Sequence, residues 1–424
     1  MKKESSYSFL RERNIIVLIS CRIIWGLTQA LFMSYFSLFA LAQQGVTLEM
    51  LGLIFSLKAV GTVILTPIAG YLADSLGRKK MIFAGTSLHA ISYLFYLVAT
   101  DYKMILVGSF VEGLAIIHFP ALQAITQDSL AQSERGLGLS ATTGLQALPS
   151  LISPFIGGIL YERLGIDTGM RIGFALAFVA GLTVAFIRLK FLNETVSKSA
   201  EKFEVGNLIS ILGKSYSGMF SILREYKELR GLIVLTTVDT FFAAIAAPFW
   251  VVYAKEVIGL STMEWGITQS LIAGVNVVVL LFSGIYADRF GRKKIMLVNL
   301  LMAPIVNISF IYCQNLYQVL LFQSFLTAQN AFTMPAASAL QADIVPKEAR
   351  GRAIAALGWQ PIVISMGAVS QGFFRCPPYF IGSLLSGYIY EMNPRYPWFL
   401  MAGAYVAEVV ICYFLIKEPE KPAE

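Results

Sequence analysis

The sequence predicts an all-α integral membrane protein with twelve transmembrane helices, arranged as two pseudo-symmetric bundles of six. Three observations lead to this fold class. Hydrophobic residues make up 56% of the 424-residue chain and charged residues only 14%, whereas a soluble domain carries about 25% charged residues. Apolar runs close to the roughly 20 residues that a bilayer core requires recur along the whole chain. One short phrase also occurs twice, half a chain apart, which indicates an internal duplication.

Twelve apolar segments account for the helices. In chain order they are residues 14–42, 48–74, 80–99, 103–127, 137–162, 171–192, 231–254, 264–287, 293–313, 317–342, 353–390 and 396–416. The only long polar stretch, residues 193–230, divides them six and six. We therefore expect an N-terminal bundle of residues 1–192, a linker of residues 193–230 and a C-terminal bundle of residues 231–424. Within the linker, apolar and polar residues alternate over 207–223, which predicts an amphipathic helix on the cytoplasmic surface.

The repeated phrase predicts a tight turn at the membrane surface in each half. Residues 70–80 read GYLADSLGRKK, and residues 284–294 read GIYADRFGRKK. The central glycines, Gly77 and Gly291, permit a sharp reversal of the chain. The basic residues that follow favour the cytoplasmic side of the membrane.

The duplication fails in one region of the second half. Extra residues lie within 353–378, around Gln360-Pro361 and Arg375-Cys376-Pro377-Pro378. Helix eleven is therefore expected to be broken, extended or preceded by a re-entrant piece, because irregular backbone is tolerated in a membrane only where protein or water covers it. A harmless insertion and a gate remain open as alternatives.

The distribution of charge predicts the orientation. Most of the 33 Lys and Arg residues fall in loops on one predicted side, the pattern of cytoplasmic loops, so both termini are expected in the cytoplasm of a multi-pass plasma membrane protein. The net charge of +7 is then explained by contact with anionic lipid, and no nucleic acid partner is expected. The first apolar run extends to Ala42, which is too long for a cleaved signal.

Several chemistries lack support in the sequence. The four cysteines are scattered through apolar segments without zinc or haem spacing, and there are only two histidines, so no metal and no cofactor are expected. His89 and His118 are expected to be packed or interfacial rather than functional. There is no nucleophile motif and no Walker loop, which argues against an integral membrane enzyme and against ATP-driven transport.

Ionisable residues inside the apolar spans are candidates for function, because placing them there is costly. Arg22 and Asp239 occupy matching positions in the two halves, each at an estimated depth of roughly 12 Å from the cytoplasmic surface. They carry opposite charges. We hypothesise that they face each other across the interface of the halves and contact the substrate or the coupling ion. A static bridge and a snorkelling arginine are the alternatives.

Lys58 and Glu112 form the second candidate pair. Their helices run in the same direction, and the two residues lie at similar depths. A neighbouring ammonium favours the charged form of a carboxyl group, whereas burial favours the neutral form. Breaking and remaking this pair would therefore change the affinity for a proton, which is the simplest coupling mechanism that the sequence offers. The alternative is a permanent bridge inside the first bundle.

Aromatic residues are dense in the first and seventh predicted helices. Gln29 lies on the Arg22 face of helix one, and Trp250 lies on the Asp239 face of helix seven. An aromatic cavity suits lipophilic or cationic compounds. The predicted sites for substrate and ion coupling are Arg22, Gln29, Lys58, Glu112, Asp239 and Trp250.

The pattern G-x-x-A-D-x-x-G-R-K-K resembles the signature of the major facilitator superfamily between its second and third helices, and the second copy matches the turn between helices eight and nine. The resemblance implies secondary transport by alternating access and, as a rule, a monomer. It also implies two charge clusters that latch the halves when the cavity opens outward. Their predicted residues are Gly70, Asp74, Gly77, Arg78 and Asp128 in one half, and Gly284, Asp288, Gly291, Arg292 and Asp343 in the other.

Two further comparisons with the family bear on the direction of transport. Residues 153–158 read SPFIGG and partly match a phrase linked to antiporters, with Ser153 in place of glycine. Family members often carry arginine in helix four and an acid in helix one, whereas here Glu112 and Arg22 occupy those helices. The function predicted first is proton-coupled efflux of a lipophilic small molecule, with no enzymatic activity and with membrane lipid as surroundings. The alternative is uptake or exchange of a small polar metabolite, such as a sugar or an organic acid.

Overall fold

The computed structural model describes residues 11–130, 145, 147–195, 208–346, 353, 356–358 and 372–417. Regular secondary structure in these ranges is helical, apart from one isolated bridge between Gln44 and Asp101. The predicted all-α class is therefore confirmed. The predicted irregularity around Gln360-Pro361 lies outside the described residues.

The first half of the chain forms a series of long helices. In order they are α1 (Arg13–Phe32), the 3-10 turn η2 (Met33–Tyr35), α2 (Phe36–Leu41), α3 (Leu48–Leu76), α4 (Arg78–Leu97), α5 (Tyr102–Ala115), α6 (His118–Asp128), η3 (Leu148–Leu151), α8 (Ser153–Leu164) and α9 (Ile166–Phe191). Polar caps begin some of them: the Thr47 hydroxyl accepts a hydrogen bond from the Met50 N–H, and the Asp101 carboxylate accepts one from the Lys103 N–H.

The second half repeats the arrangement after the linker helix. The elements are α10 (Leu208–Glu225), α11 (Leu229–Ala246), η5 (Ala247–Phe249), α12 (Trp250–Glu256), α13 (Thr262–Phe290), α14 (Arg292–Ile311), α15 (Leu316–Ile344), η6 (Phe373–Arg375), α17 (Cys376–Met392) and α18 (Tyr396–Leu415). Ser261 and Glu264 form a capping box at the start of α13. Pro377 lies at the start of α17, where its missing N–H removes no helical hydrogen bond.

Each of the twelve predicted spans overlaps one or more of these helices, although several are interrupted and the spans of residues 137–162 and 353–390 are described only in part. Within the described ranges, eight helical stretches are long and apolar enough to cross a membrane. The first span changes to a 3-10 turn at Met33, the fourth is broken after Ala115, and the seventh is broken at η5, which contains Pro248. In the eleventh span, residues 353, 356 and 357 are helical, as predicted, and helix α17 begins at Cys376.

Both predicted turns are present. Gly77 joins α3 to α4 with a φ of 92°, and Gly291 joins α13 to α14 with a φ of 86°. This left-handed region is readily accessible to glycine only. The repeated phrase thus produces the same reversal of the chain in each half.

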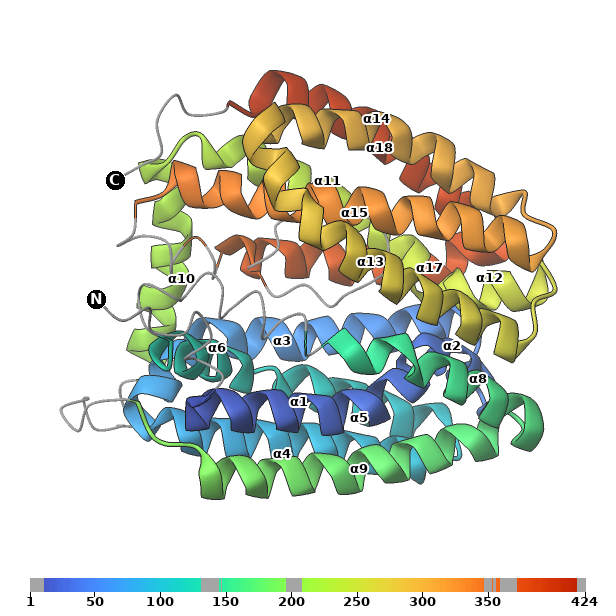
Figure 1. The fold of residues 1–424 in the computed structure, drawn as a ribbon, viewed down its shortest axis with the longest axis horizontal. Helices are drawn as coiled ribbons and strands as arrows, with labels where there is room; N and C mark the ends of the chain where they lie inside the picture. The colour runs from blue at the N-terminus through green and yellow to red at the C-terminus, as the bar shows by residue number, and fades with distance from the viewer. Residues whose placement is uncertain are drawn as a thin grey trace.

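The helices of each half pack mainly with one another, as Figure 1 shows: the blue to green helices form one group and the yellow to red helices the other. In the first group α4 packs on α9 and α3 on α5, and in the second α14 packs on α15 and α18. The start of α1 and the end of α18 lie at one end of the molecule, which we call the terminal end. We call the opposite end the far end.

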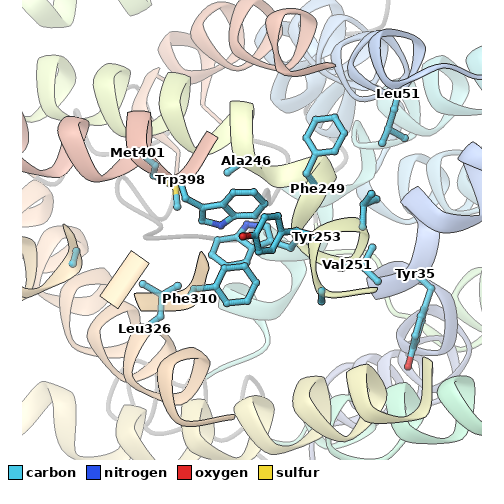
Figure 2. Packing of buried hydrophobic residues seen from close by; sticks show 14 of the residues in the cluster. Tyr35, Leu51, Ala246, Phe249, Val251, Tyr253, Phe310, Leu326, Trp398 and Met401 are labelled. Atoms are coloured by element: carbon cyan, nitrogen blue, oxygen red, sulfur yellow. The ribbon is translucent and has the colours of Figure 1, made fainter. Parts of the chain in front are cut away.

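An aromatic cluster anchors the second half near the far end. The ring of Trp398 lies 4.5 Å from that of Tyr253 and 5.6 Å from that of Phe310, measured between ring centroids (Figure 2). The Tyr253 hydroxyl donates to the backbone oxygen of Ile311 at 2.7 Å. Packing of this kind fixes α12, which begins with Trp250, relative to α14 and α18.

The linker helix α10 crosses the terminal end between the two groups (Figure 1). The Tyr216 hydroxyl donates to the backbone oxygen of Val63 in α3, and the Tyr216 ring lies 5.3 Å from that of Phe373 in η6. The predicted helix is therefore present and contacts both halves.

At the far end, α3 of the first half packs closely against α17 of the second. A Cβ atom on Gly52 would overlap the backbone oxygen of Ser383, and a Cβ atom on Gly387 would overlap that of Leu48. Gly52 of α3 thus lies against the Ser383 carbonyl, one turn before Gly387 in α17. In return, Gly387 lies against the Leu48 carbonyl, one turn before Gly52. Such close approach of two backbones requires small residues.

The same reciprocal contact joins α8 to α13. A Cβ atom on Gly158 would lie 2.6 Å from the backbone oxygen of Thr262, and one on Gly266 would lie 2.5 Å from that of Pro154. Two glycine contacts, one on each side of the molecule, therefore join the halves at the far end.

Candidate functional site

A cavity of about 310 Å³ lies between the halves, near the far end. Its walls come from α1 to α5 of the first half and from η5, α12 and α13 of the second. Most of the lining is apolar, and the aromatic part consists of Phe32, Phe36, Phe55, Tyr96, Trp250 and Trp265. Lys58, Glu112 and Gln269 supply the main polar groups. An apolar pocket with a few polar groups is the usual form of a small-molecule site.

Lys58 and Glu112 form an ion pair in the wall of this cavity. Both side chains are mostly buried, with 20% and 13% of their surfaces exposed. Their helices can approach closely because Gly113 of α5 has no side chain. A Cβ atom at that position would overlap the backbone oxygen of Lys58. Lys58 and Glu112, which were paired in the sequence because they lie at similar predicted depths, are therefore in contact in the structure.

Glu112 has two further neighbours on α4 that the sequence analysis did not select. The Tyr96 hydroxyl donates to Oε2 at 2.9 Å, and His89 Nε2 lies 3.6 Å from Oε1. The Tyr93 hydroxyl lies 3.0 Å from the same histidine nitrogen and accepts a hydrogen bond from Gln29 Nε2 at 2.6 Å. The spacing of residues 89, 93 and 96 along one helical face could have revealed this group.

Gln29 and Trp250 have different environments. Gln29 belongs to the polar network behind the cavity wall, through its contact with Tyr93. Trp250 lines the cavity itself, with its ring 4.7 Å from Phe310 and 5.5 Å from Trp398.

Arg22 and Asp239 do not lie as expected. Arg22 acts electrostatically on Tyr93 and His89 in the first half. Asp239 is buried in the second half and acts on Arg375 and Glu408. The expectation that they face each other is not met, because α11 turns residue 239 toward α17 and α18, against which it packs.

Asp239 therefore belongs to a buried cluster that the sequence analysis missed. Arg375, which precedes α17, donates from Nε to the Thr240 hydroxyl at 3.0 Å. Glu408 of α18 is fully buried, and neither of its carboxyl oxygens has a hydrogen-bond partner among the described residues. The signal was available, since Glu408 is an acid inside an apolar span.

The predicted charge clusters are present in part at the terminal end. Arg78 forms an ion pair with Asp128, and Arg292 forms one with Asp343. The side chains of Asp74 and Asp288 and the surroundings of Gly70 and Gly284 lie outside the described part of the structure, so the place of these residues in the clusters stays a prediction. Within the described residues, no group of three or more His, Cys, Asp or Glu side chains is arranged to hold a metal ion.

Comparison with known proteins identifies the family. The family model described as Major Facilitator Superfamily matches residues 18–356 and 232–424. The chain is 23% identical to the "Multi-drug resistance efflux pump PmrA homolog" of Lactococcus lactis, over 89% of each chain. It is 27% identical to the "Multidrug resistance protein MdtG" of Salmonella arizonae, over 68% of this chain and 69% of that one.

Two solved structures share the fold at low sequence identity. One is the nucleoside transporter NupG, with a TM-score of 0.69 and 14% identity, covering 96% of this chain and 100% of that chain. The other is the human organic anion transporter MFSD10, with a TM-score of 0.67 and 15% identity, covering 94% and 99%.

Proposed function

The chain belongs to the major facilitator superfamily, and we propose that it exports a lipophilic, cationic small molecule in exchange for protons by alternating access. It is a membrane transporter and not an enzyme. The terminal end is cytoplasmic in this proposal, because the basic turns at Arg78 and Arg292 lie there. The protein then resides in the plasma membrane with both termini inside the cell.

The observation that carries the proposal is the Lys58–Glu112 ion pair in an aromatic cavity between the halves. Aromatic walls attract organic cations. A cation that enters can compete with the Lys58 ammonium for the Glu112 carboxylate. A proton on that carboxylate removes the charge that holds the cation. Binding of substrate and binding of a proton at Glu112 therefore exclude each other, which is what exchange requires.

The halves, residues 1–192 and 231–424, move relative to each other in this proposal. The far end is closed in the present structure by the Gly52–Gly387 and Gly158–Gly266 contacts. Release to the outside requires these contacts to separate while the terminal end closes through the Arg78 and Arg292 clusters. This is alternating access about a site at the interface of two repeats.

The relatives, one named as a multi-drug resistance efflux pump homolog and one as a multidrug resistance protein, support export rather than uptake. Likeness to a nucleoside transporter and the polar groups of Lys58, Glu112 and Gln269 favour a second candidate, uptake or exchange of a small polar metabolite. The surface of the cavity is mostly apolar and includes six aromatic side chains, so we place export first.

Transport by purified protein in liposomes separates the two candidates. Ethidium serves as the lipophilic cation and uridine as the polar metabolite. Ethidium movement that requires an imposed proton gradient and stops with an uncoupler supports export. Uridine counterflow without a gradient, in the absence of ethidium transport, supports the second candidate.

A further inference from the structure

We propose that His89 carries the proton to Glu112 and thereby releases Lys58 from its ion pair. The inference rests on the proposed exchange of substrate for protons and names a residue for the proton's route. Nothing in the function proposed above requires a histidine. The geometry around His89 Nε2 points to this role.

His89 Nε2 lies between two oxygen atoms. The Tyr93 hydroxyl oxygen is 3.0 Å away, and Glu112 Oε1 is 3.6 Å away. Gln29 Nε2 already donates to the Tyr93 oxygen at 2.6 Å, so the Tyr93 hydroxyl hydrogen is available to point at His89. In the neutral state, therefore, Nε2 accepts from Tyr93 and the ring proton resides on Nδ1.

Protonation of His89 exchanges the partner of Nε2. The imidazolium carries a hydrogen on both ring nitrogens, so Nε2 can no longer accept from Tyr93. It can donate to the carboxylate of Glu112, and a hydrogen bond between charged groups is stronger than one between neutral groups. A movement of less than 1 Å closes the gap from 3.6 Å to hydrogen-bond distance.

The oxygen that His89 approaches is the one that Lys58 contacts. Lys58 Nζ and His89 Nε2 both lie next to Glu112 Oε1. When the proton passes from Nε2 to Oε1, the imidazolium becomes neutral imidazole and the carboxylate becomes a neutral acid. The proton enters His89 from water and leaves Glu112 to water on the other side, so charge and atoms balance.

The consequence for the cavity is a change of charge. The Lys58–Glu112 pair is neutral as a whole, but after proton transfer the Lys58 ammonium has lost its counter-ion. Lys58 lines the cavity, so the wall becomes positive and repels a bound cation. Proton delivery through His89 would thus expel the substrate.

His89 is surrounded by both signs of charge. The ionisable groups around it are Arg22 from α1, Lys58 from α3, Tyr93 from α4 itself, Glu112 from α5, His118 from α6 and, across Trp25, Arg188 from α9. Glu112 is the acid among them, and it favours the charged imidazole. The nearby cations oppose it.

His118 provides a matched control. It is buried like His89, with its ring centroid 6.0 Å from that of His89. Its Nδ1 faces the backbone oxygen of Ala115. Among the described residues it is His89, and not His118, that lies next to the Glu112 carboxylate. Both histidines lie beside Trp25, at 5.1 Å for His89 and 6.4 Å for His118 between ring centroids.

Trp25 fluorescence tests the inference without transport. The other four tryptophans are replaced by phenylalanine, and emission is followed against pH, since imidazolium quenches a nearby indole. We expect quenching on acidification that His89→Gln abolishes and His118→Gln retains. Glu112→Gln should move the midpoint to lower pH, because the imidazolium loses its carboxylate neighbour. Quenching that persists in H89Q, or that H118Q abolishes as well, would overturn the inference.

A transport assay provides the second readout. H89Q should reduce ethidium export driven by a proton gradient about tenfold or more, while gradient-free ethidium exchange, which also reports correct folding, stays within about twofold of H118Q. Gradient-driven export by H89Q at the H118Q level would also overturn the inference. If the parent protein moves no ethidium at all, the proposed export fails, and the Trp25 titration alone decides the role of His89.

Discussion

Lys58 of α3 and Glu112 of α5, separated by 54 positions in the chain, form an ion pair in the wall of the cavity between the halves. Both groups are mostly buried, yet both line the space that a substrate would fill. A buried pair is strongly destabilised when one partner is removed, because the other charge stays unpaired. Neutralising Glu112 therefore leaves the charge of Lys58 unpaired beside the cavity, where it acts on a bound cation.

Replacing Glu112 by Gln should uncouple transport from protons. The amide keeps the size of the side chain and the contact with Tyr96, but it cannot bind and release a proton. We expect gradient-driven ethidium export to fall about a hundredfold, and any residual ethidium movement to be slow and independent of the pH gradient, because the charge that holds the cation is lost. Initial rates in liposomes with and without a pH gradient measure this. Gradient-driven export at the parent rate would reject Glu112 as the coupling site.

Replacing Gly52 by Val should open the far end. The added side chain overlaps the backbone oxygen of Ser383, so α3 and α17 cannot approach as they do here. Gly403→Val is the matched control, since a Cβ atom at Gly403 meets nothing within 4 Å. Thiol labelling of Ser34→Cys, a cavity position, from the external side should rise severalfold in the Gly52 variant alone. Equal labelling in both variants would show that this contact does not close the far end.

Removing the charge of Arg375 should destabilise the second half. Arg375→Met leaves the buried Asp239 without the cation on which it acts, and removing one partner of a buried charge pair costs about 3–5 kcal/mol. Thermal unfolding in detergent measures the loss, and Arg224→Met on the exposed face of α10 is the control. Adding Asp239→Asn to Arg375→Met should recover part of the stability, because the unpaired charge is then removed. A double variant no more stable than Arg375→Met would show that the two charges are not coupled.

The terminal ion pairs should affect rate rather than stability. The side chain of Asp128 is 42% exposed, and exposed pairs contribute about 0–1 kcal/mol. Asp128→Asn should thus leave thermal unfolding nearly unchanged. It should slow ethidium transport severalfold, because the pair with Arg78 holds the terminal end in one state of the cycle. A large loss of thermal stability with an unaltered transport rate would reverse this assignment.

The sequence predicted the fold well because bilayer thickness and duplication constrain it. Apolar length located the spans, and the two glycine turns at Gly77 and Gly291 follow from one local conformation. Depth along a helix also paired Lys58 with Glu112 correctly. Helix length and the depth of a residue in the membrane follow from the number of residues along the chain, so the sequence alone predicts them.

The rotation of each helix about its axis could not be predicted from residue numbers in the same way. Arg22 and Asp239 have matching depths, but packing of α11 on α17 and α18 turns Asp239 into its own half. His89 reaches Glu112 because α4 and α5 pack together with a particular rotation. Tertiary packing decides such contacts, and the linear pattern does not contain it.

The most direct test of the account is the proton movement that ethidium itself drives. Liposomes that contain the protein and a trapped pH indicator are given an outward ethidium gradient, with no pH gradient imposed. Exchange predicts that protons enter as ethidium leaves, so the lumen acidifies in the parent protein and not in the Glu112→Gln variant. Ethidium exit without acidification, or acidification that survives in the variant, would contradict the account.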